Sequence, residues 1–300
     1  MPDKQDIKAQ VQRFYDQVGW QVDDPQGHYQ NAQYEDLRPV SADYIRAAHE
    51  RVGAQLPPEG EYLLDAGSGP VQWPAYLAYS AGYKYRVCLD ISHVALLEAR
   101  KRLGEHGLYV VADVAQLPFR REAFDGIVAL HTIHHLPADE KPACYRGLYA
   151  TLKPGGRMVT VDGWTEVGAG KAIDLVHRIA LKLRKPVINR EIPVPPVPMA
   201  ASEVLGEDPY NGADPQKTNG PAGTHVVKTS AAWFKRTFDG QMPYRILPWR
   251  SVNVRWLREV IPNNRFGKLL LRLLSGLEQS FPRYFGENGQ YPLIVFSKPS

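Results

Sequence analysis

Short apolar runs alternate with amphipathic segments through the middle of the chain. Five runs, YLLDA, RVCLD, LYVVA, GIVAL and RMVTVD, predict strands at residues 62–66, 86–90, 108–112, 126–130 and 157–162. Three stretches between them have the spacing of helices, at 73–80, 94–106 and 139–152. Apolar strands that alternate with helices are typical of a parallel sheet buried on both faces, with right-handed crossovers. The pattern therefore predicts an α/β fold.

The region before this alternation, and the region just after it, follow other patterns. Apolar positions at helical spacing predict helices at 5–18 and 42–52, which we assign to an N-terminal helical cover over residues 1–59. Residues 60–300 are predicted to form the main domain. An insertion is expected at 165–228, much of which is too rich in proline and glycine for regular elements.

The last third of the chain returns to the sheet. A helix is predicted at 229–239 and a sixth strand at 244–248. A second insertion follows at 251–289, and the run PLIVFSK at 292–298 predicts the final strand.

Composition and charge narrow the class of protein. No apolar run approaches the roughly 20 residues that span a bilayer, the first residues form no apolar signal segment, and two cysteines cannot build a disulfide framework. We therefore expect a cytoplasmic protein with reduced cysteines. Residues 1–150 have a net charge of −5 and residues 151–300 one of +9. The basic half indicates either an anionic substrate or surface, or a solvated basic face.

The segment LLDAGSGP, residues 63–70, is the strongest chemical signal. A strand runs into Asp65, Gly67 and Gly69, and a helix follows. Glycines at these positions let the backbone turn tightly and approach a ligand, and a helix start offers free N–H groups. A Gly-x-Gly turn alone is a weak signal, because many tight turns share it.

Two further acids strengthen this signal. Asp90 ends the second predicted strand, where a carboxylate can accept both hydroxyls of a ribose. Asp113 follows the third, where it can accept the amine of adenine while Val114 donates a backbone N–H. Because the ends of parallel strands meet at one edge of the sheet, the three acids are expected to point into one crevice.

Five segments now resemble a known family in order and spacing. LLDAGSGP, CLDIS, ADVAQLPF, FDGIVALHTIHHL and LKPGGRMVTVD, within residues 60–163, resemble class I S-adenosylmethionine-dependent methyltransferases of the small-molecule type. The resemblance implies a Rossmann-like, seven-stranded and mostly parallel sheet whose last strand is antiparallel, with helical insertions. The terminal run YPLIVFSK fits that plan.

The resemblance also implies a cofactor, S-adenosyl-L-methionine, and the residues that bind it. It assigns cofactor contacts to Tyr15 (in a lid), Asp65, Gly67, Gly69, Asp90, Ile91, Asp113, Val114 and His131. The chain departs from the family pattern at one point, because Pro70 and Val71 stand where the family often has a third glycine.

Two histidines follow the fourth strand. His134 and His135 are the candidate catalytic residues, because imidazole titrates near neutral pH and the pair lies beside the expected methyl position. A structural role for the pair is the alternative interpretation. No metal is expected, because no acid lies at ligand spacing. Asp162, Trp164 and His225 are placed at the acceptor pocket, where each is more often a cap or packing residue.

The predicted function is methyl transfer to a small-molecule acceptor by in-line displacement. The acceptor classes are a phenol, a quinone, a sugar or a lipid-linked and anionic compound. An oxidoreductase with a nicotinamide cofactor and a non-catalytic cofactor-binding module are the alternatives. The dinucleotide fingerprint lacks its third glycine here. A nucleic-acid acceptor is not expected, because HTIHHL stands where an N-P-P-Y motif would follow the fourth strand.

Each insertion contains one amphipathic helix with a basic side, at 172–184 and 266–281. One interpretation is a pair of core helices whose basic sides are solvated. The other is a surface that contacts anionic lipid head groups or a lipid-linked acceptor. No oligomeric state follows from the pattern.

Overall fold

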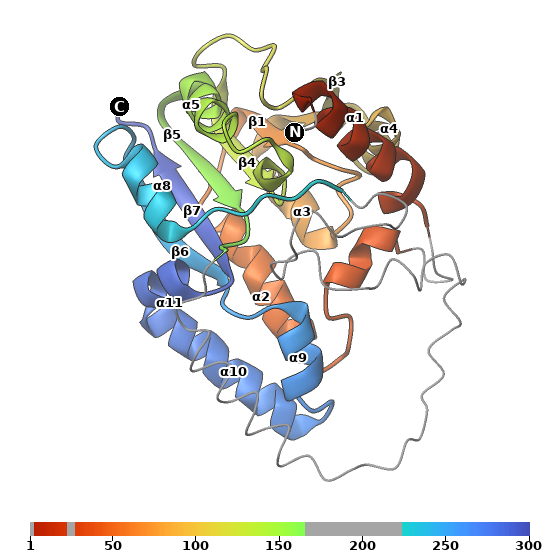
Figure 1. The fold of residues 1–300 in the computed structure, drawn as a ribbon, viewed down its shortest axis with the longest axis vertical. Coiled ribbons are helices and arrows are strands. Elements are labelled where there is room, and N and C mark those ends of the chain that lie inside the picture. The colour runs from red at the N-terminus through yellow and green to blue at the C-terminus, as the bar shows by residue number, and fades with distance from the viewer. Residues whose placement is uncertain (1–2, 23–27, 166–223) are drawn as a thin grey trace.

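The computed structural model describes residues 3–22, 28–165 and 224–300 (Figure 1). Seven strands form one sheet in the order β3-β2-β1-β4-β5-β7-β6. They are β1 Gly60–Ala66, β2 Tyr83–Asp90, β3 Gly107–Val111, β4 Phe124–Leu130, β5 Leu152–Val161, β6 Tyr244–Arg250 and β7 Tyr291–Ser297. Strands β1 to β5 pair in parallel, and β7 lies antiparallel between β5 and β6. The predicted Rossmann-like sheet with an antiparallel last strand is confirmed.

Two of the described α-helices precede the first strand, and the others lie in the connections between strands. The described α-helices are α1 Lys4–Phe14, α2 Ala42–Gly53, α3 Pro74–Ala78, α4 His93–Leu103, α5 Lys141–Thr151, α8 Ala231–Phe238, α9 Val254–Val260, α10 Arg265–Ser280 and α11 Pro282–Asn288. The helix expected at 5–18 is α-helical only to Phe14 and continues as a π-helical turn over Tyr15–Gly19. The second insertion holds three helices, α9 to α11. Among the described ranges, no helix is both long and apolar enough to cross a bilayer.

Two predictions about domain organisation are not tested by this fold. The division into an N-terminal cover, 1–59, and a main domain, 60–300, stays a prediction. The helix expected at 172–184, and all but the last residues of the insertion that contains it, lie outside the described residues.

The sheet is buried on both faces. Leu64 packs in a cluster with Leu148 of α5 and Phe234 of α8. Its neighbour Leu63 points to the other face, in a cluster with Val52 of α2. All five side chains are fully buried. Both faces are thus sealed by apolar contacts, as the apolar strands predict, and polar groups gather where the strands end.

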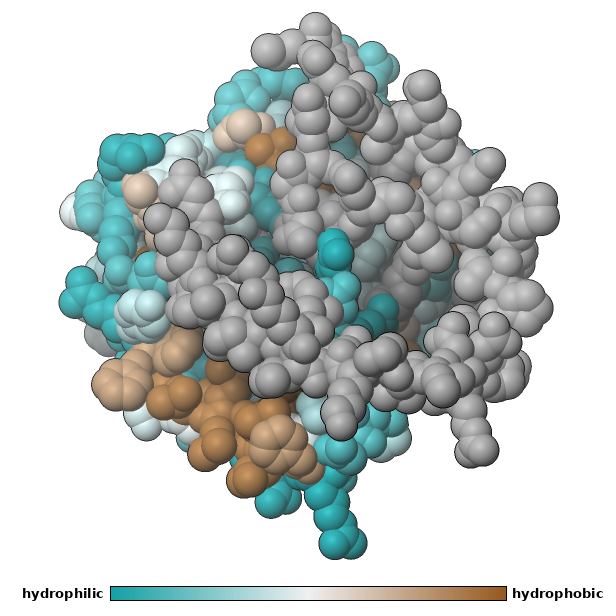
Figure 2. Space-filling view, turned by 60° about the horizontal axis from the view of Figure 1, so that its bottom comes forward, coloured by the Kyte–Doolittle hydropathy of each residue, from teal (hydrophilic) through white to brown (hydrophobic). Residues whose placement is uncertain are grey.

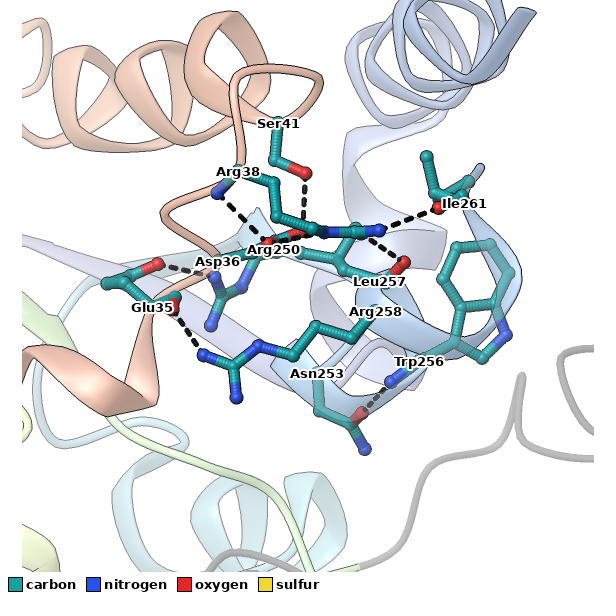
Figure 3. A network of polar contacts seen from close by, with 10 residues as sticks. All are labelled: Glu35, Asp36, Arg38, Ser41, Arg250, Asn253, Trp256, Leu257, Arg258 and Ile261. Carbon is teal, nitrogen blue, oxygen red and sulfur yellow. Dashed lines mark hydrogen bonds and ion pairs between the residues drawn. The ribbon is translucent and has the colours of Figure 1, made fainter. Parts of the chain in front are cut away.

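Hydrogen bonds and an ion pair hold the segment 35–41, which follows the first helix, against β6 and α9 (Figure 3). Arg250 Nη1 donates to Glu35 Oε2 at 2.7 Å, and both side chains are buried. The Arg38 guanidinium donates to Asp36 at 2.8 Å and to two carbonyl oxygens at the end of α9, at 2.7 and 2.9 Å. A cation at a helix C-terminus is favourable because the last carbonyls there lack helical partners. Residues more than 200 positions apart are held together in this way.

Candidate functional site

The carboxyl ends of β1 to β4 surround a cavity of about 130 Å³. All residues assigned to the cofactor from the sequence lie on its wall: Tyr15, Asp65, Gly67, Gly69, Asp90, Ile91, Asp113, Val114 and His131. His135 lies on the wall as well. The wall also includes residues that were not predicted, among them Lys8, Trp20, Asn31, Gln72, Tyr76 and Thr132.

The turn after β1 requires glycine because of its backbone and its protein neighbours. Gly67 and Gly69 have φ values of +73° and +53°, in the left-handed region. A Cβ on Gly67 would lie 2.2 Å from Thr132 Cγ2, and one on Gly69 would lie 2.9 Å from the Trp20 ring. Val71, where the family often has its third glycine, also has a positive φ of 53° and is fully buried. The departure at this position therefore keeps a left-handed backbone, at the cost of strain in a β-branched residue.

Asp90 is fixed by two backbone donors. Its Oδ2 accepts the N–H of Gly69 at 2.8 Å, and its Oδ1 accepts the N–H of Ser92 at 2.8 Å. Burial raises the pKa of Asp90 to about 6, although the two backbone hydrogen bonds act in the opposite direction. Each carboxylate oxygen accepts one backbone bond and keeps further acceptor capacity. A buried carboxylate with two such oxygens fits a pair of ribose hydroxyls.

The other two acids are held by cations of the chain itself. Asp65 Oδ2 pairs with Arg86, at 2.5 Å to Nη2 and 3.1 Å to Nε, and Arg86 is almost fully buried. Asp113 Oδ2 lies 2.6 Å from Lys8 Nζ, and its Oδ1 accepts the N–H of Ala115. Neither cation was predicted from the sequence. A basic residue inside the apolar run RVCLD is the signal that points to the first.

His131 lines the cavity and has a buried ring nitrogen, Nδ1, without a hydrogen-bond partner in the described structure. Burial, followed by the neighbouring His134, lowers the pKa of His131 to about 3, so the ring is neutral at physiological pH. Its φ is +54°, and its backbone N–H donates to Val161 at 2.7 Å. A buried polar atom without a partner, in a residue that lines the cavity, fits a site that takes a polar ligand.

A chain of hydrogen bonds leads from the end of β5 into the cavity. Asp162 Oδ1 lies 2.9 Å from His134 Nδ1, and His134 Nε2 lies 3.1 Å from His135 Nε2. His135 Nε2 lies 2.8 Å from the Tyr15 hydroxyl, and its Nδ1 lies 2.7 Å from the carbonyl oxygen of His225. We refer to Asp162, His134, His135 and Tyr15 as the relay.

The hydrogen bonds of the relay require a definite number of protons. A carbonyl oxygen only accepts, so His135 Nδ1 carries a proton. A hydrogen bond between the two Nε2 atoms needs a proton there, and the bond between His134 Nδ1 and Asp162 needs another. These contacts together require one proton more than an ionised Asp162 and two neutral imidazoles supply. Burial raises the pKa of Asp162 and lowers those of both histidines, which favours keeping this proton on the carboxyl.

Two more polar groups surround the inner end of the relay, and neither was predicted. The Tyr145 hydroxyl donates to Asp162 Oδ2 at 3.2 Å. Lys141 is buried, and its Nζ donates to the carbonyl oxygen of Val227. Burial lowers the pKa of Lys141 to about 8. Both groups are close enough to influence the charge of Asp162.

Three residues lie elsewhere than the sequence suggested. His134 does not line the cavity but lies behind His135, in a small pocket with Asp162. Trp164 packs in the core, where its Nε1 donates to a backbone carbonyl at 2.9 Å. His225 contributes its carbonyl oxygen to the relay rather than its ring. Sequence spacing did not show these differences because they depend on how β5 and the segment from residue 224 meet β4.

Comparison with known proteins agrees with this geometry. Residues 64–160 match the family model described as a methyltransferase domain. The chain is 31% identical over 134 residues to methyltransferase GfsG of Streptomyces halstedii, covering 41% of this chain and 47% of that protein. It is 30% identical over 109 residues to the ubiquinone/menaquinone biosynthesis C-methyltransferase UbiE of Vibrio vulnificus, covering 34% and 41%. The chain thus spans about half or less of the length of these relatives.

A solved structure extends the similarity to the whole fold. Geranyl diphosphate C-methyltransferase of Streptomyces coelicolor aligns with a TM-score of 0.50 and 18% identity, over 97% of this chain and 98% of that one. At this identity the likeness concerns the fold alone. Of the interpretations that the sequence left open, the family match favours the methyltransferase over the nicotinamide-dependent oxidoreductase. Residues 64–160 belong to the class I S-adenosylmethionine-dependent methyltransferases.

Proposed function

We propose that the protein transfers a methyl group from S-adenosylmethionine to a small-molecule acceptor whose reacting atom loses a proton. Phenols, quinols and sugar hydroxyls are such acceptors, and so is the acidic ring carbon of a quinone precursor. The observation that carries this proposal is the relay, because it connects a buried carboxyl to the cavity through two imidazoles and a phenol.

The cavity wall fits the cofactor. Asp90 would hold the ribose hydroxyls, and Asp113 and Val114 would face the adenine. The turn at Gly67 and the neutral pair of Asp65 with Arg86 would face the methionine portion. When bound, S-adenosylmethionine supplies a methyl carbon on a sulfonium, which an in-line nucleophile takes as S-adenosylhomocysteine leaves.

His135 is the residue of the chain that would take the acceptor's proton. The acceptor atom forms its bond to the methyl carbon and loses its own proton to His135 Nε2, directly or through the Tyr15 hydroxyl. Before the proton arrives, His134 Nε2 and His135 Nε2 both carry lone pairs, and these repel each other. Arrival of the proton creates the hydrogen bond between His135 and His134, and the proton on His134 Nδ1 passes to Asp162, so that both imidazoles end neutral. The observed 3.1 Å contact is therefore the proton-loaded form.

Calorimetry with S-adenosylhomocysteine, followed by an acceptor screen, tests this proposal. The full chain is incubated with S-adenosylmethionine and one member of each acceptor class, and the methylated products are detected by mass spectrometry. His135→Gln is expected to lower kcat about 100-fold and to remove the acidic limb of its pH profile, because a general base contributes about that much. His93→Gln, on the exposed side of α4, is the matched control.

Two results would contradict the proposal. Failure to bind S-adenosylhomocysteine would overturn the cofactor. Binding without transfer to any acceptor class would instead support the non-catalytic cofactor-binding module.

A further inference from the structure

One face of α10 and the start of α11 carries a row of exposed apolar side chains. The row consists of Phe266, Leu269, Leu273, Leu277, Phe281 and Tyr284, each about half exposed. Figure 2 shows a continuous hydrophobic area on the side of the molecule where Figure 1 places α10. Soluble surfaces rarely gather so many large apolar side chains in one place. We refer to these six residues as the apolar row.

The apolar row does not lie on the face that packs against the protein. The buried positions of α10 are Gly267, Leu271 and Glu278. At about 100° per residue, these positions lie on a different side of the helix from 269 and 273. A Cβ on Gly267 would lie 1.9 Å from a backbone oxygen of the preceding loop, so the packed face is already in close contact. Folding of the helix therefore does not require the apolar row.

The charges beside the apolar row have one sign. Arg265, Lys268 and Arg272 are exposed on α10 and, at about 100° per residue, form a line beside the apolar row. Glu278, the acid of this helix, is fully buried and pairs with Arg51 at 2.7 Å. The exposed surface of α10 is therefore apolar along one line and basic along the next.

The basic charges beside the apolar row favour one binding partner over the others that could cover it. A second copy docking through the same face would bring like charges together, and the amphipathic segment at 172–184 is itself basic. An anionic bilayer offers apolar contact and opposite charge together. Leucine and phenylalanine enter the boundary between head groups and acyl chains, while lysine and arginine stay at the head groups.

We propose that α10 and the start of α11 dock on an anionic membrane surface through the apolar row and its basic flank. The helix lies in the plane of the interface and does not cross it. This inference does not depend on the proposed function, since it holds whether or not the methyl acceptor is a lipid.

Flotation with vesicles tests the docking. The full chain is mixed at low salt with vesicles of phosphatidylcholine alone or with one third phosphatidylserine. We expect binding to the anionic vesicles only, and weaker binding as salt rises. The double variant Leu269→Ser/Leu273→Ser is expected to lower the partition coefficient about 10-fold or more. The triple variant Arg265→Gln/Lys268→Gln/Arg272→Gln is expected to remove the preference for phosphatidylserine.

A matched control separates docking from general stickiness. Leu97→Ser changes an equally exposed leucine on α4 and is expected to leave vesicle binding unchanged. Unaltered thermal unfolding of the double variant checks its folding. Absence of binding at low salt, or equal losses in the double variant and the control, would overturn the inference. Sedimentation that shows a dimer in the wild type and a monomer in the double variant would assign the apolar row to a second copy instead.

Discussion

The two halves of the sheet are held by contacts that differ in the distance along the sequence between their partners. In the cofactor half, β1 to β4 with α3 and α4, Asp90 bonds to Gly69, only 21 residues away. In the distal half, β5 to β7 with α8 to α11, Arg250 pairs with Glu35 across 215 residues. The first half depends on strands and turns that form from neighbouring sequence. The second depends on buried charges that meet only when the chain has closed.

The same contrast appears at the surface of each half. The cofactor half turns its strand ends into a cavity, where Asp65 and Asp90 are held by partners 21 residues away. The distal half exposes the apolar row and its basic flank, and it buries Arg250 and Glu278. Ligand binding and folding stability are therefore expected to respond to different substitutions, which the following experiments separate.

Breaking the buried pair of the distal half should have the largest effect. Glu35→Ala leaves the guanidinium of Arg250, 2% exposed, without its carboxylate. We expect the free energy of unfolding to fall by about 3–5 kcal/mol, because an uncompensated charge stays buried. Urea unfolding followed by circular dichroism measures this. Glu50→Ala removes an exposed acid that pairs with Arg46, and it should cost less than about 0.5 kcal/mol. Similar losses in the two variants would contradict the assigned role.

Removing the Asp90 carboxylate should affect binding more than folding. Asp90→Ala deletes two acceptor oxygens in the cavity, and charged hydrogen bonds are each worth about 1.5–3 kcal/mol. We expect the Kd for S-adenosylhomocysteine to rise about 10- to 100-fold, measured by calorimetry. Asp43→Ala, at an exposed position of α2, is the control. An unchanged Kd in Asp90→Ala would remove this acid from the cofactor site.

His131 lies where the two halves meet, and because of it the free energy of unfolding should fall at acidic pH. Its pKa is about 3 in the folded protein because of burial, against 6.5 as the ordinary value. As pH falls, the unfolded chain binds the proton first. This contribution to stability is therefore complete above about pH 6.5 and is lost progressively down to about pH 3. We expect a loss of about 2 kcal/mol between about pH 6.5 and 5.

A matched pair of variants isolates this effect. In His131→Asn, which tolerates the positive φ, unfolding should depend less on pH than in the wild type. His93→Asn should keep the wild-type dependence, since its side chain is exposed. Parallel pH curves for the wild type and His131→Asn would show that the imidazole is not the acid-sensitive group.

Helix caps should have the smallest effect, and a similar one in both halves. Ser92 accepts the N–H of Ala95 at 3.1 Å in α4, and Ser230 accepts that of Trp233 at 3.1 Å in α8. Each serine-to-alanine variant should lose about 1 kcal/mol of unfolding free energy. A larger loss at Ser92 would measure its second bond, to Asp16. Equal stability of both variants and the wild type would show that neither cap contributes.

Sequence patterns determined the strands and the acids at their carboxyl ends. The apolar runs located every strand, because a strand buried on both faces must be apolar throughout. Asp90 and Asp113 fell where strands end, so parallel topology alone brought them to one edge. The family motifs added the turn at Gly67. These features depend on residues close together in the chain, which a linear pattern records.

Only the tertiary structure decided how the charges are paired and where the relay leads. Tyr15 lies 120 residues from His135, and nothing in the spacing of either residue points to the other. The same holds for Arg250 with Glu35 and for the partners of Glu278. Such contacts form when distant elements pack, since burying a charge without a partner would cost several kcal/mol. The sequence by itself thus determined which elements form and which edge of the sheet gathers the three acids, and packing decided which side chains share protons and charge.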